Sequence, residues 1–410
     1  MNELSDAARA HVDALTKTWL GLSPDADAPS LPDSLARRLL RGEEYEHAHR
    51  DQWGNWEFGF CEAYRDGRLW EPELDRWLLD QRRELGDAAP PMWPEGRPFA
   101  ICLSHDVDLI ADKVTPRQAV RSMRLSLLDT PASSRDRLVR LARPGVRAAR
   151  AIHHGVSAAP VAEALERCVD LEHEHDLAAT YFFTVYPGGD GHRYDCMYAL
   201  PDGCRFRGER NTVADVIRTL HDEGLEIGLH GSYNSALAPG RLADERTELE
   251  QATGLTVTST RQHFLHWDVR VTPRLQSDAG FLADSSIGFN RDIGLRSGTS
   301  LPFRWFDVER GTALDIVQLP PTVQDGALLR ADALELGLEL ARTTLRGFLD
   351  RIADVGGVAT LVFHPNNLEH ADYLELFRQA IAYGLERDAW FASMRDLDSW
   401  FRARELGRPA

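Results

Sequence analysis

The chain has 410 residues, and its 47 lysines and arginines stand against 64 aspartates and glutamates, a net charge of -17. This length allows two or three domains or one large barrel. A hydrophobic content of 43% with 27% charged residues excludes wholesale disorder. The acidity excludes general binding to nucleic acid, because attraction of the whole molecule to phosphate requires the opposite charge.

Residues 1–95 predict a helical N-terminal domain. The opening MNELSDAARAHVDALTK has the pattern of a helix and lacks the basic start and apolar run of a signal peptide, so we expect a cytoplasmic protein. The proline-rich segment 87–98 ends this domain. We expect its tryptophans to pack in a core. These are Trp19, Trp53, Trp56, Trp70 and Trp77.

Beyond this boundary, short apolar runs alternate with helical segments and predict a second domain over residues 96–405. The predicted strands are 99–104, 179–185, 225–230, 259–263, 313–319, 358–364 and 390–393. The predicted helices are 161–176, 212–224, 241–254, 331–353 and 368–387. Strands that alternate with helices indicate a parallel sheet, either open or closed into a barrel.

A basic insertion at about 110–155 interrupts this alternation. Residues 113–150 contain ten lysines and arginines but only two aspartates. The apolar residues of this segment are segregated, which predicts helices with a basic face. Three interpretations stay open: a solvated insertion, a lid over an anionic substrate, or a peripheral contact with a membrane surface or an anionic glycan.

Polar and ionisable residues form five clusters, four at the ends of predicted strands and one, 283–289, near the strand predicted at 313–319. These clusters are SHDVD at 104–108, GLHGSYNS at 228–235, RQHFLHWD at 261–268, ADSSIGF at 283–289 and HPNN at 364–367. The C-terminal ends of parallel strands open onto one face, where active sites of such proteins are built. The five clusters therefore predict one functional site.

The residue types of these clusters suit metal-assisted hydrolysis. Asp106, Asp108, His230 and His364 offer carboxylate and imidazole groups. Such groups hold a divalent ion of the zinc type and leave positions for water and substrate. A second carboxylate acts as general base, and a histidine opposite protonates the leaving group.

At these residues the sequence resembles the polysaccharide deacetylase (NodB-homology) family. The resemblance covers about residues 97–400 without the basic insertion. It implies an α/β fold, a distorted (β/α)7-type barrel, and a hydrolase of carbon–nitrogen bonds. The implied reaction is the metal-dependent removal of an acyl group, acetyl in this family, from an amino sugar of a polysaccharide or its precursor. The implied cofactor is a divalent metal, zinc, and the implied partner is a carbohydrate substrate.

The first two motifs imply the base and the metal ligands. SHDVD stands at the first motif, so the resemblance gives Asp106 as general base and Asp108, displaced by one residue, as metal ligand. HGSYN stands at the second motif, so His230 is the first metal histidine. Asn234 stands where the second metal histidine is expected, and Ser235 or His266 are alternatives for completing the site.

The remaining motifs imply substrate contacts and the acid. The segment 261–267 is similar to the groove-lining third motif, and Asp284 to the fourth, which orients the base. The implied substrate-binding residues are Arg261, His266, Trp267 and Asp284. LVFH at 361–364 is similar to the fifth motif and gives His364 as general acid.

Two other interpretations stay open because Val107 and Asn234 depart from the family pattern. One is a C–N amide hydrolase of the same fold that works without a metal. The other is a catalytically silent barrel that binds glycan or acts as a scaffold. The sequence contains no G-x-S-x-G elbow, no P-loop and no dinucleotide-binding G-x-G-x-x-G, which leaves serine-hydrolase and nucleotide chemistry without support.

Overall fold

The computed structural model describes residues 4–86, 92–111, 115–121, 160–186, 188 and 191–408. Its central element is a parallel sheet with the strand order β10-β11-β1-β2-β5-β6-β7-β9, followed by β8, which is antiparallel to β9. β12 pairs with β1 outside this path. The strands are β1 Ala100–Val107, β2 Ala179–Phe183, β5 Glu226–Gly231, β6 Ser259–Gln262, β7 Ala283–Asp284, β8 Phe303–Asp307, β9 Thr312–Gln318, β10 Val323–Gln324, β11 Val358–Phe363 and β12 Trp390–Phe391. Because the end strands β10 and β8 are not neighbours, the described strands form a distorted barrel that hydrogen bonds do not close.

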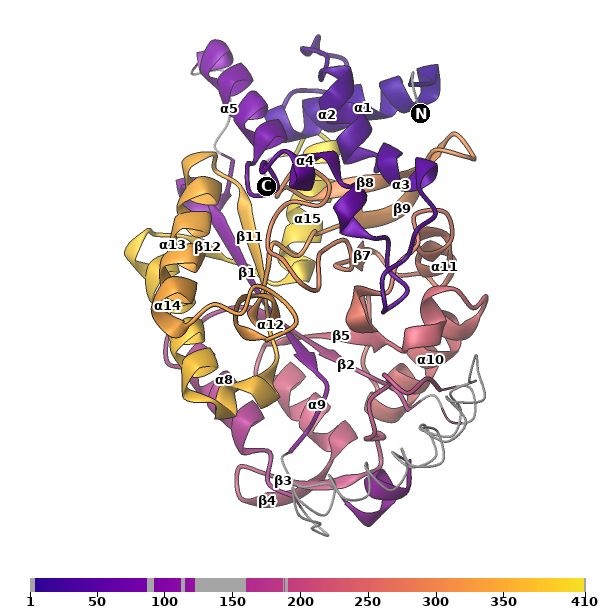
Figure 1. Ribbon diagram of the computed structural model, residues 1–410, viewed down its shortest axis with the longest axis vertical. Helices are drawn as coiled ribbons and strands as arrows, with labels where there is room; N and C mark the ends of the chain where they lie inside the picture. Colours follow the sequence, from indigo (N-terminus) through magenta and orange to yellow (C-terminus); the bar gives the residue numbers. More distant parts are fainter. Residues whose placement is uncertain are drawn as a thin grey trace.

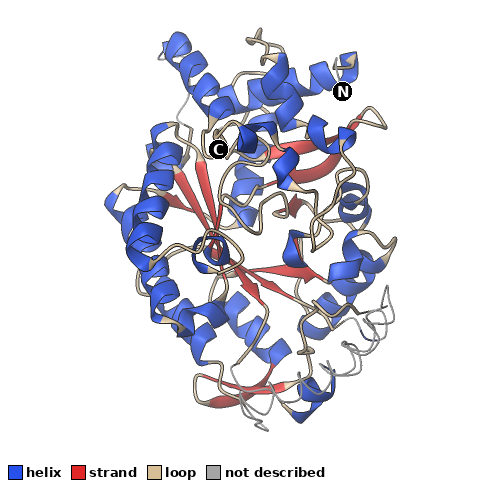
Figure 2. Cartoon of the chain, viewed as in Figure 1, coloured by secondary structure: helices blue, strands red, loops and turns tan. Residues whose placement is uncertain are grey.

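Helices surround these strands (Figures 1 and 2). They are α8 Glu163–His173, α9 Val213–Asp222, α10 Arg241–Thr253, α11 Thr272–Asp278, α12 Asp325–Leu329, α13 Leu338–Asp354, α14 Ala371–Glu386 and α15 Met394–Glu405. Local sequence fixes their ends: α9 begins at a capping box between Thr212 and Asp215, and α10 ends at Gly254, whose φ is 77°. A small antiparallel hairpin, β3 Gly203–Phe206 and β4 Glu209–Thr212, lies outside the main sheet.

The N-terminal segment is helical and packs against one end of the barrel (Figure 1). Its helices are α1 Asp6–Leu20, α2 Asp33–Leu39, α3 Gly42–Glu46, α4 Glu62–Arg65 and α5 Glu73–Leu85. The Trp19 indole is fully buried and donates to the Pro302 carbonyl at 2.8 Å. The Asp75 carboxylate, also buried, accepts from the Ser300 backbone at 2.9 Å. The helices and the barrel thus share one hydrophobic core, whereas the domain boundary near residue 95 stays a prediction.

The alternation of strands and helices is confirmed, with differences where elements are short. The strands β7, β8 and β10 and the β3–β4 hairpin were not predicted, because their short segments lack an apolar run that would mark them in the sequence. The helix expected from residue 331 begins at Leu338, because Glu335 has a left-handed φ of 51° and Gly337 is extended. Most of the basic insertion lies outside the described residues. Within the described ranges, no helix has the length and apolar character needed to cross a membrane.

Candidate active site

Five ionisable side chains meet where four parallel strands end. Asp106 lies in β1 and Asp108 just beyond it, His230 lies in β5, and His263 and His364 directly follow β6 and β11. These strands are parallel, so their C-terminal ends share one edge of the sheet. The five residues line one cavity of about 70 Å³. The rest of its lining is Phe264, Leu265, Asn290, Gln324 and Arg330.

Asp106 is held as a carboxylate by Arg261. The buried guanidinium donates from Nη1 to Asp106 Oδ1 at 2.8 Å, and it is itself fixed by Ser104 Oγ at 2.8 Å and the Ser285 carbonyl at 2.9 Å. Burial raises the pKa of Asp106, but the charges of Arg261, His230 and His364 together outweigh burial and leave this pKa below its ordinary value. Asp106 is therefore ionised at neutral pH and able to accept a proton.

Asp108 is the centre of a cluster of metal-binding side chains. Its Oδ1 lies 3.4 Å from His230 Nε2 and 3.5 Å from His263 Nε2. The Cys196 thiol approaches the same oxygen at 3.7 Å. Burial lowers the pKa of His263, but the carboxylates of Asp108 and Asp195 together outweigh burial and raise this pKa to about 10. The cluster therefore attracts positive charge.

The outer nitrogen of His230 is hydrogen-bonded and that of His263 faces a carboxylate, and the inner nitrogens of both rings point toward Asp108. His230 Nδ1 donates to the Arg261 carbonyl at 2.9 Å, and His263 Nδ1 faces Asp195 Oδ1 at 3.9 Å. His230 Nε2 is buried and has no hydrogen-bond partner within the described part of the chain. Two oriented imidazoles and a carboxylate form the ligand set of a catalytic zinc site, so the residues present fit such an ion.

His364 faces the two aspartates from the opposite side of the cavity. Its Nε2 lies 4.0 Å from Asp106 Oδ2 and 3.9 Å from Asp108 Oδ2. Its Nδ1 donates to the buried Asp325 at 2.8 Å. Burial lowers the pKa of His364, but the carboxylates around it, Asp325 foremost, together outweigh burial and raise this pKa to about 9. His364 is therefore protonated at neutral pH and can donate a proton.

The structure brings Arg261 to Asp106, but it places Asp284 elsewhere. Asp284 is fully buried, and its Oδ1 accepts from Gln276 Nε2 at 2.7 Å and from Ser286 Oγ. It does not line the cavity. The group that contacts and orients the base is Arg261, and Asp284 supports the segment behind it.

The other residues expected around the site lie outside the cavity. Asn234 is exposed on the 3-10 turn η5 (Tyr233–Ala236), and Ser235 is buried with its hydroxyl on the Ser232 carbonyl at 2.7 Å. The His266 ring stacks on Tyr233 with centroids 4.1 Å apart. Trp267 is buried in the core. The structure thus favours His263 over Asn234, Ser235 and His266 as the partner of His230.

Sequence reasoning did not single out His263, Asp325, Asp195 or Cys196. His263 stands in the quoted segment RQHFLHWD, but the second histidine was sought four residues after His230, where the family motif has it. Its position at the end of β6, next to β5, is the signal that would have found it, because neighbouring parallel strands bring their ends together. Asp325 follows the two-residue strand β10, which the sequence pattern does not reveal.

The backbone after His263 is strained and is held from two sides. Phe264 and Leu265 have left-handed φ values of 59° and 48°. The Phe264 carbonyl accepts from Asn55 Nδ2 at 2.9 Å and from Asn290 Nδ2 at 2.6 Å. Residues without the freedom of glycine adopt this region only where their surroundings fix it. The N-terminal segment, through Asn55, therefore helps to position His263.

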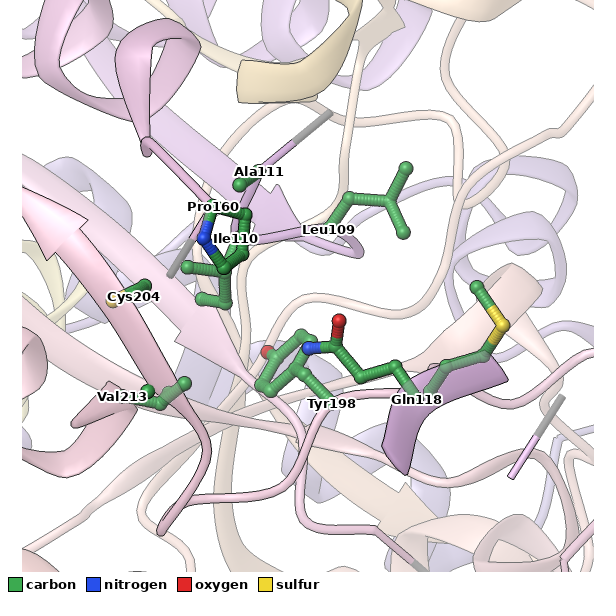
Figure 3. A pocket seen from close by; sticks show the side chains of 10 residues that line it. Leu109, Ile110, Ala111, Gln118, Pro160, Tyr198, Cys204 and Val213 are labelled. Atoms are coloured by element: carbon green, nitrogen blue, oxygen red, sulfur yellow. The ribbon is translucent and has the colours of Figure 1, made fainter. Parts of the chain in front are cut away.

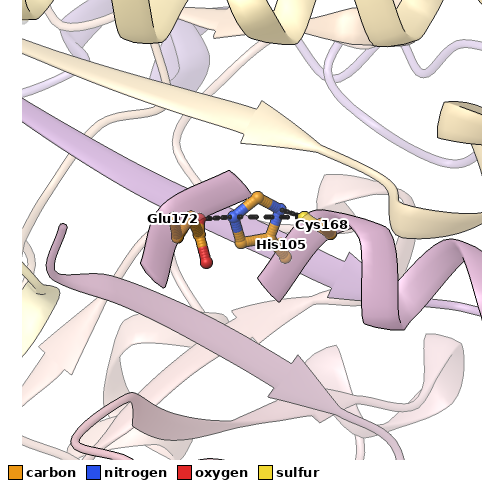
Figure 4. Close-up of side chains that lie close together, drawn as sticks. All are labelled: His105, Cys168 and Glu172. Atoms are coloured by element: carbon orange, nitrogen blue, oxygen red, sulfur yellow. Dashed lines mark hydrogen bonds and ion pairs between the residues drawn. The ribbon is translucent and has the colours of Figure 1, made fainter. Parts of the chain in front are cut away.

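Two other groups near the site belong to the scaffold. Figure 4 shows His105 between Glu172 and Cys168 on α8. His105 Nε2 contacts Glu172 Oε1 at 2.6 Å and Nδ1 lies 3.1 Å from the Phe363 carbonyl, so its nitrogens already have partners. Figure 3 shows a second, mostly apolar cavity beside Leu109 and Tyr198. Its volume of about 10 Å³ admits about one water and no substrate.

No protein-family model and no curated protein matches the sequence, but solved structures do. A Mycobacterium smegmatis protein assigned as a polysaccharide deacetylase is 19% identical, with a TM-score of 0.50 over 78% of this chain and 95% of that chain. Puue allantoinase is 16% identical, with a TM-score of 0.48 over 78% of this chain and 96% of that one. A Parabacteroides distasonis protein assigned as a glycoside hydrolase/deacetylase is 12% identical, with a TM-score of 0.46 over 76% of this chain and 73% of that one. The first likeness shows that the chain has the fold of that protein, as expected from the resemblance.

Proposed function

We propose that this chain is a metal-dependent hydrolase that removes an acyl group from an amino sugar of a polysaccharide or its precursor. The observation that carries the proposal is that one cavity contains an ionised carboxylate bound by Arg261, a protonated histidine and three side chains that can bind a metal. Asp106 is the general base, His364 the general acid, and Asp108, His230 and His263 hold the metal. These are the parts that metal-assisted hydrolysis of an amide requires.

The chemistry that a bound divalent ion supplies is the polarisation of a water molecule and of the substrate carbonyl. Asp106 takes the proton from the attacking water, and Arg261 keeps this carboxylate ionised and oriented at 2.8 Å. His364 approaches from the far side of the cavity and gives a proton to the departing nitrogen. Asp325 holds the His364 ring and keeps its other nitrogen protonated until that step.

The substrate class follows from the cavity and the fold. A cavity of about 70 Å³ suits a small acyl group such as acetyl and leaves the sugar at the entrance. The fold is shared with a protein assigned as a polysaccharide deacetylase, which supports an amino sugar as the acyl carrier. Contact of the basic segment 113–150 with an anionic glycan or a membrane surface, and a location in the cytoplasm, belong to this proposal as expectations from sequence.

Hydrolysis without a metal and a silent glycan-binding barrel are weaker candidates. Both were motivated by Asn234 in place of a metal histidine, and the silent barrel also by Val107 in the first motif. His263 supplies an imidazole next to His230, with ring centroids 4.8 Å apart, which answers the departure at Asn234. Asp108 beside these rings supplies a carboxylate in spite of Val107. A silent barrel would also have no reason to keep both an ionised base and a protonated acid facing the same cavity.

The test is acetate release from tetraacetylchitotetraose by the metal-stripped protein before and after addition of zinc. We expect activity only with metal and a loss of at least ~10²-fold in kcat for Asp106→Asn, the usual contribution of a general base. Asp278→Asn, on the exposed end of α11, is the matched control and should keep wild-type activity. Full activity of the stripped protein, or of Asp106→Asn, would refute the proposal.

A further inference from the structure

Gln324 lies on the inner face of the barrel, one residue row below the acid and the base. It pairs with Val362 of β11, and Val362 pairs with Ser104 of β1. Residues aligned in a parallel sheet point to the same side. Ser104 points inward, because its hydroxyl accepts from the same Arg261 that holds Asp106. Gln324 therefore points inward as well, and it lines the cavity.

The side-chain amide of Gln324 lacks a protein partner at its oxygen. The residue is only 8% exposed, and its Oε1 has no hydrogen-bond partner within the described ranges of the chain. A buried carbonyl oxygen without a donor is costly. Such a group is kept where a ligand supplies the missing donor, and here the oxygen belongs to a side chain that lines the reaction cavity.

The position of β10 indicates which part of the substrate reaches Gln324. In the strand order β10-β11-β1-β2-β5-β6, the metal-ligand strands β5 and β6 lie on one side of β1, while His364 follows β11 on the other side. β10 lies beyond β11, on the side of the general acid. The group that meets His364 is the departing nitrogen, so Gln324 lies on the side of this nitrogen.

We propose that Gln324 Oε1 accepts the N–H of the scissile amide and thereby makes the site selective for amides over esters. This inference rests on the proposed function and adds a substrate-reading residue to it. An amide nitrogen carries the hydrogen that Oε1 lacks. An ester oxygen at the same place only accepts, so Oε1 would stay unpaired against another acceptor. A site built to bind a donor rejects the analogue without that donor.

The experiment compares two matched substrates on the zinc-loaded protein: tetraacetylchitotetraose, an amide, and 2-O-acetylated cellotetraose, its oxygen analogue. Gln324→Met keeps the size of the side chain and removes the acceptor. We expect it to lower kcat/KM for the amide at least 10-fold more than for the ester. The melting temperature of the variant should not fall, because an unpaired polar group has been removed from the interior.

Thr360→Val is the matched control. Thr360 is also fully buried on the inner face of β11, and its Oγ1 also lacks a hydrogen-bond partner among the described residues, but it does not line the cavity. Its replacement should leave the amide-to-ester ratio of kcat/KM unchanged. The same ratio shift in Thr360→Val would overturn the inference, since it would trace the effect to general repacking of the barrel.

The failure of this inference differs from that of the proposed function. Suppose that the wild-type protein cleaves the amide and that Gln324→Met lowers kcat/KM for the amide and the ester equally. Gln324 then holds a water or serves the scaffold, so the inference is overturned while the proposed function stands. If the wild-type protein with zinc cleaves neither substrate, both are overturned. A selective loss of amide cleavage in a folded Gln324→Met variant supports both.

Discussion

Replacing His263 with alanine is expected to remove one of three metal ligands while leaving the barrel folded. The His263 ring contributes Nε2, 3.5 Å from Asp108 Oδ1, to a cluster in which His230 and Asp108 are the other two donors. Under the sequence-based expectation, the residue to replace is instead Asn234. The two variants therefore test which residue binds the metal beside His230: His263, as the structure indicates, or Asn234, as the spacing of the family motif predicts.

The expected loss of zinc affinity can be estimated from the side chains that contact the metal ligands. Removing an outer-shell partner that orients a metal histidine costs about 10- to 100-fold in affinity. Asp195 has this position behind His263 Nδ1, at 3.9 Å. Asp195→Asn should therefore weaken zinc binding by about 10- to 100-fold. Loss of the ligand itself costs at least the upper figure, so His263→Ala should weaken binding by ~100-fold or more, or ~2.7 kcal/mol.

Zinc affinity is measured by competition with a chromophoric chelator, starting from metal-stripped protein, and the melting temperature of the stripped protein reports folding. Asn234→Ala is the control, and we expect its zinc affinity to equal that of the wild type, because the residue is exposed outside the cavity. His263→Asn serves as a second variant if the alanine variant unfolds. Wild-type affinity in a folded His263 variant, or loss of affinity in Asn234→Ala, would refute the assignment of His263.

Three further predictions concern the charges around the site. Asp325→Asn removes the main group that raises the pKa of His364 to about 9. The fall of kcat/KM at alkaline pH should therefore move from near pH 9 toward neutral pH. If this fall does not move, His364 is not the acid held by Asp325. Arg261→Met leaves the buried Asp106 carboxylate without its partner and should lower the free energy of unfolding by about 3–5 kcal/mol in urea denaturation; a loss below about 1 kcal/mol would show that the pair contributes little. Burial raises the pKa of Asp284 from the ordinary 3.8 to about 7, so the folded protein binds this proton more tightly than the unfolded chain does and loses stability as the pH rises from about 4 to 7. The difference amounts to at most about 4 kcal/mol, and Asp284→Asn should flatten that part of the curve of unfolding free energy against pH; an unchanged curve would contradict the shifted pKa.

The parts of the fold that the sequence predicts are those with long, regular patterns. The apolar run at β1 and the run at β11 lead directly into Asp106 and His364, and the alternation with helices indicates that such ends share one face. Asp106, Asp108, His230 and His364 could therefore be brought together from sequence alone. Their order along the chain and their position after strands were sufficient.

The parts that escape prediction depend on contacts between strands. His263 becomes a partner of His230 only because β6 pairs with β5, with Arg261 opposite His230 in the register. Gln324 lies in β10, and Asp325 directly follows it as the first residue of α12. β10 has only two residues, and its existence depends on pairing with β11. No periodicity marks such a strand, because pairing partners distant in the chain define it. The motif spacing predicts the second metal histidine at position 234, on the turn after β5, whereas the fold supplies His263 from the end of the neighbouring strand β6.

The hydrogen bond from Asn55 to the Phe264 carbonyl joins the helical N-terminal segment to the candidate active site. Two consecutive left-handed residues next to His263 store a few kcal/mol of strain, about 1–3 kcal/mol each. The fragment that begins at residue 96 would keep the two aspartates and three histidines that line the cavity, yet it would lack one of the two amides that hold this turn. We therefore expect that the barrel cannot be transferred to another protein without residues 1–95 and keep its site intact. A hybrid enzyme built on it would have to carry residues 1–95 along or supply an equivalent donor to position 264.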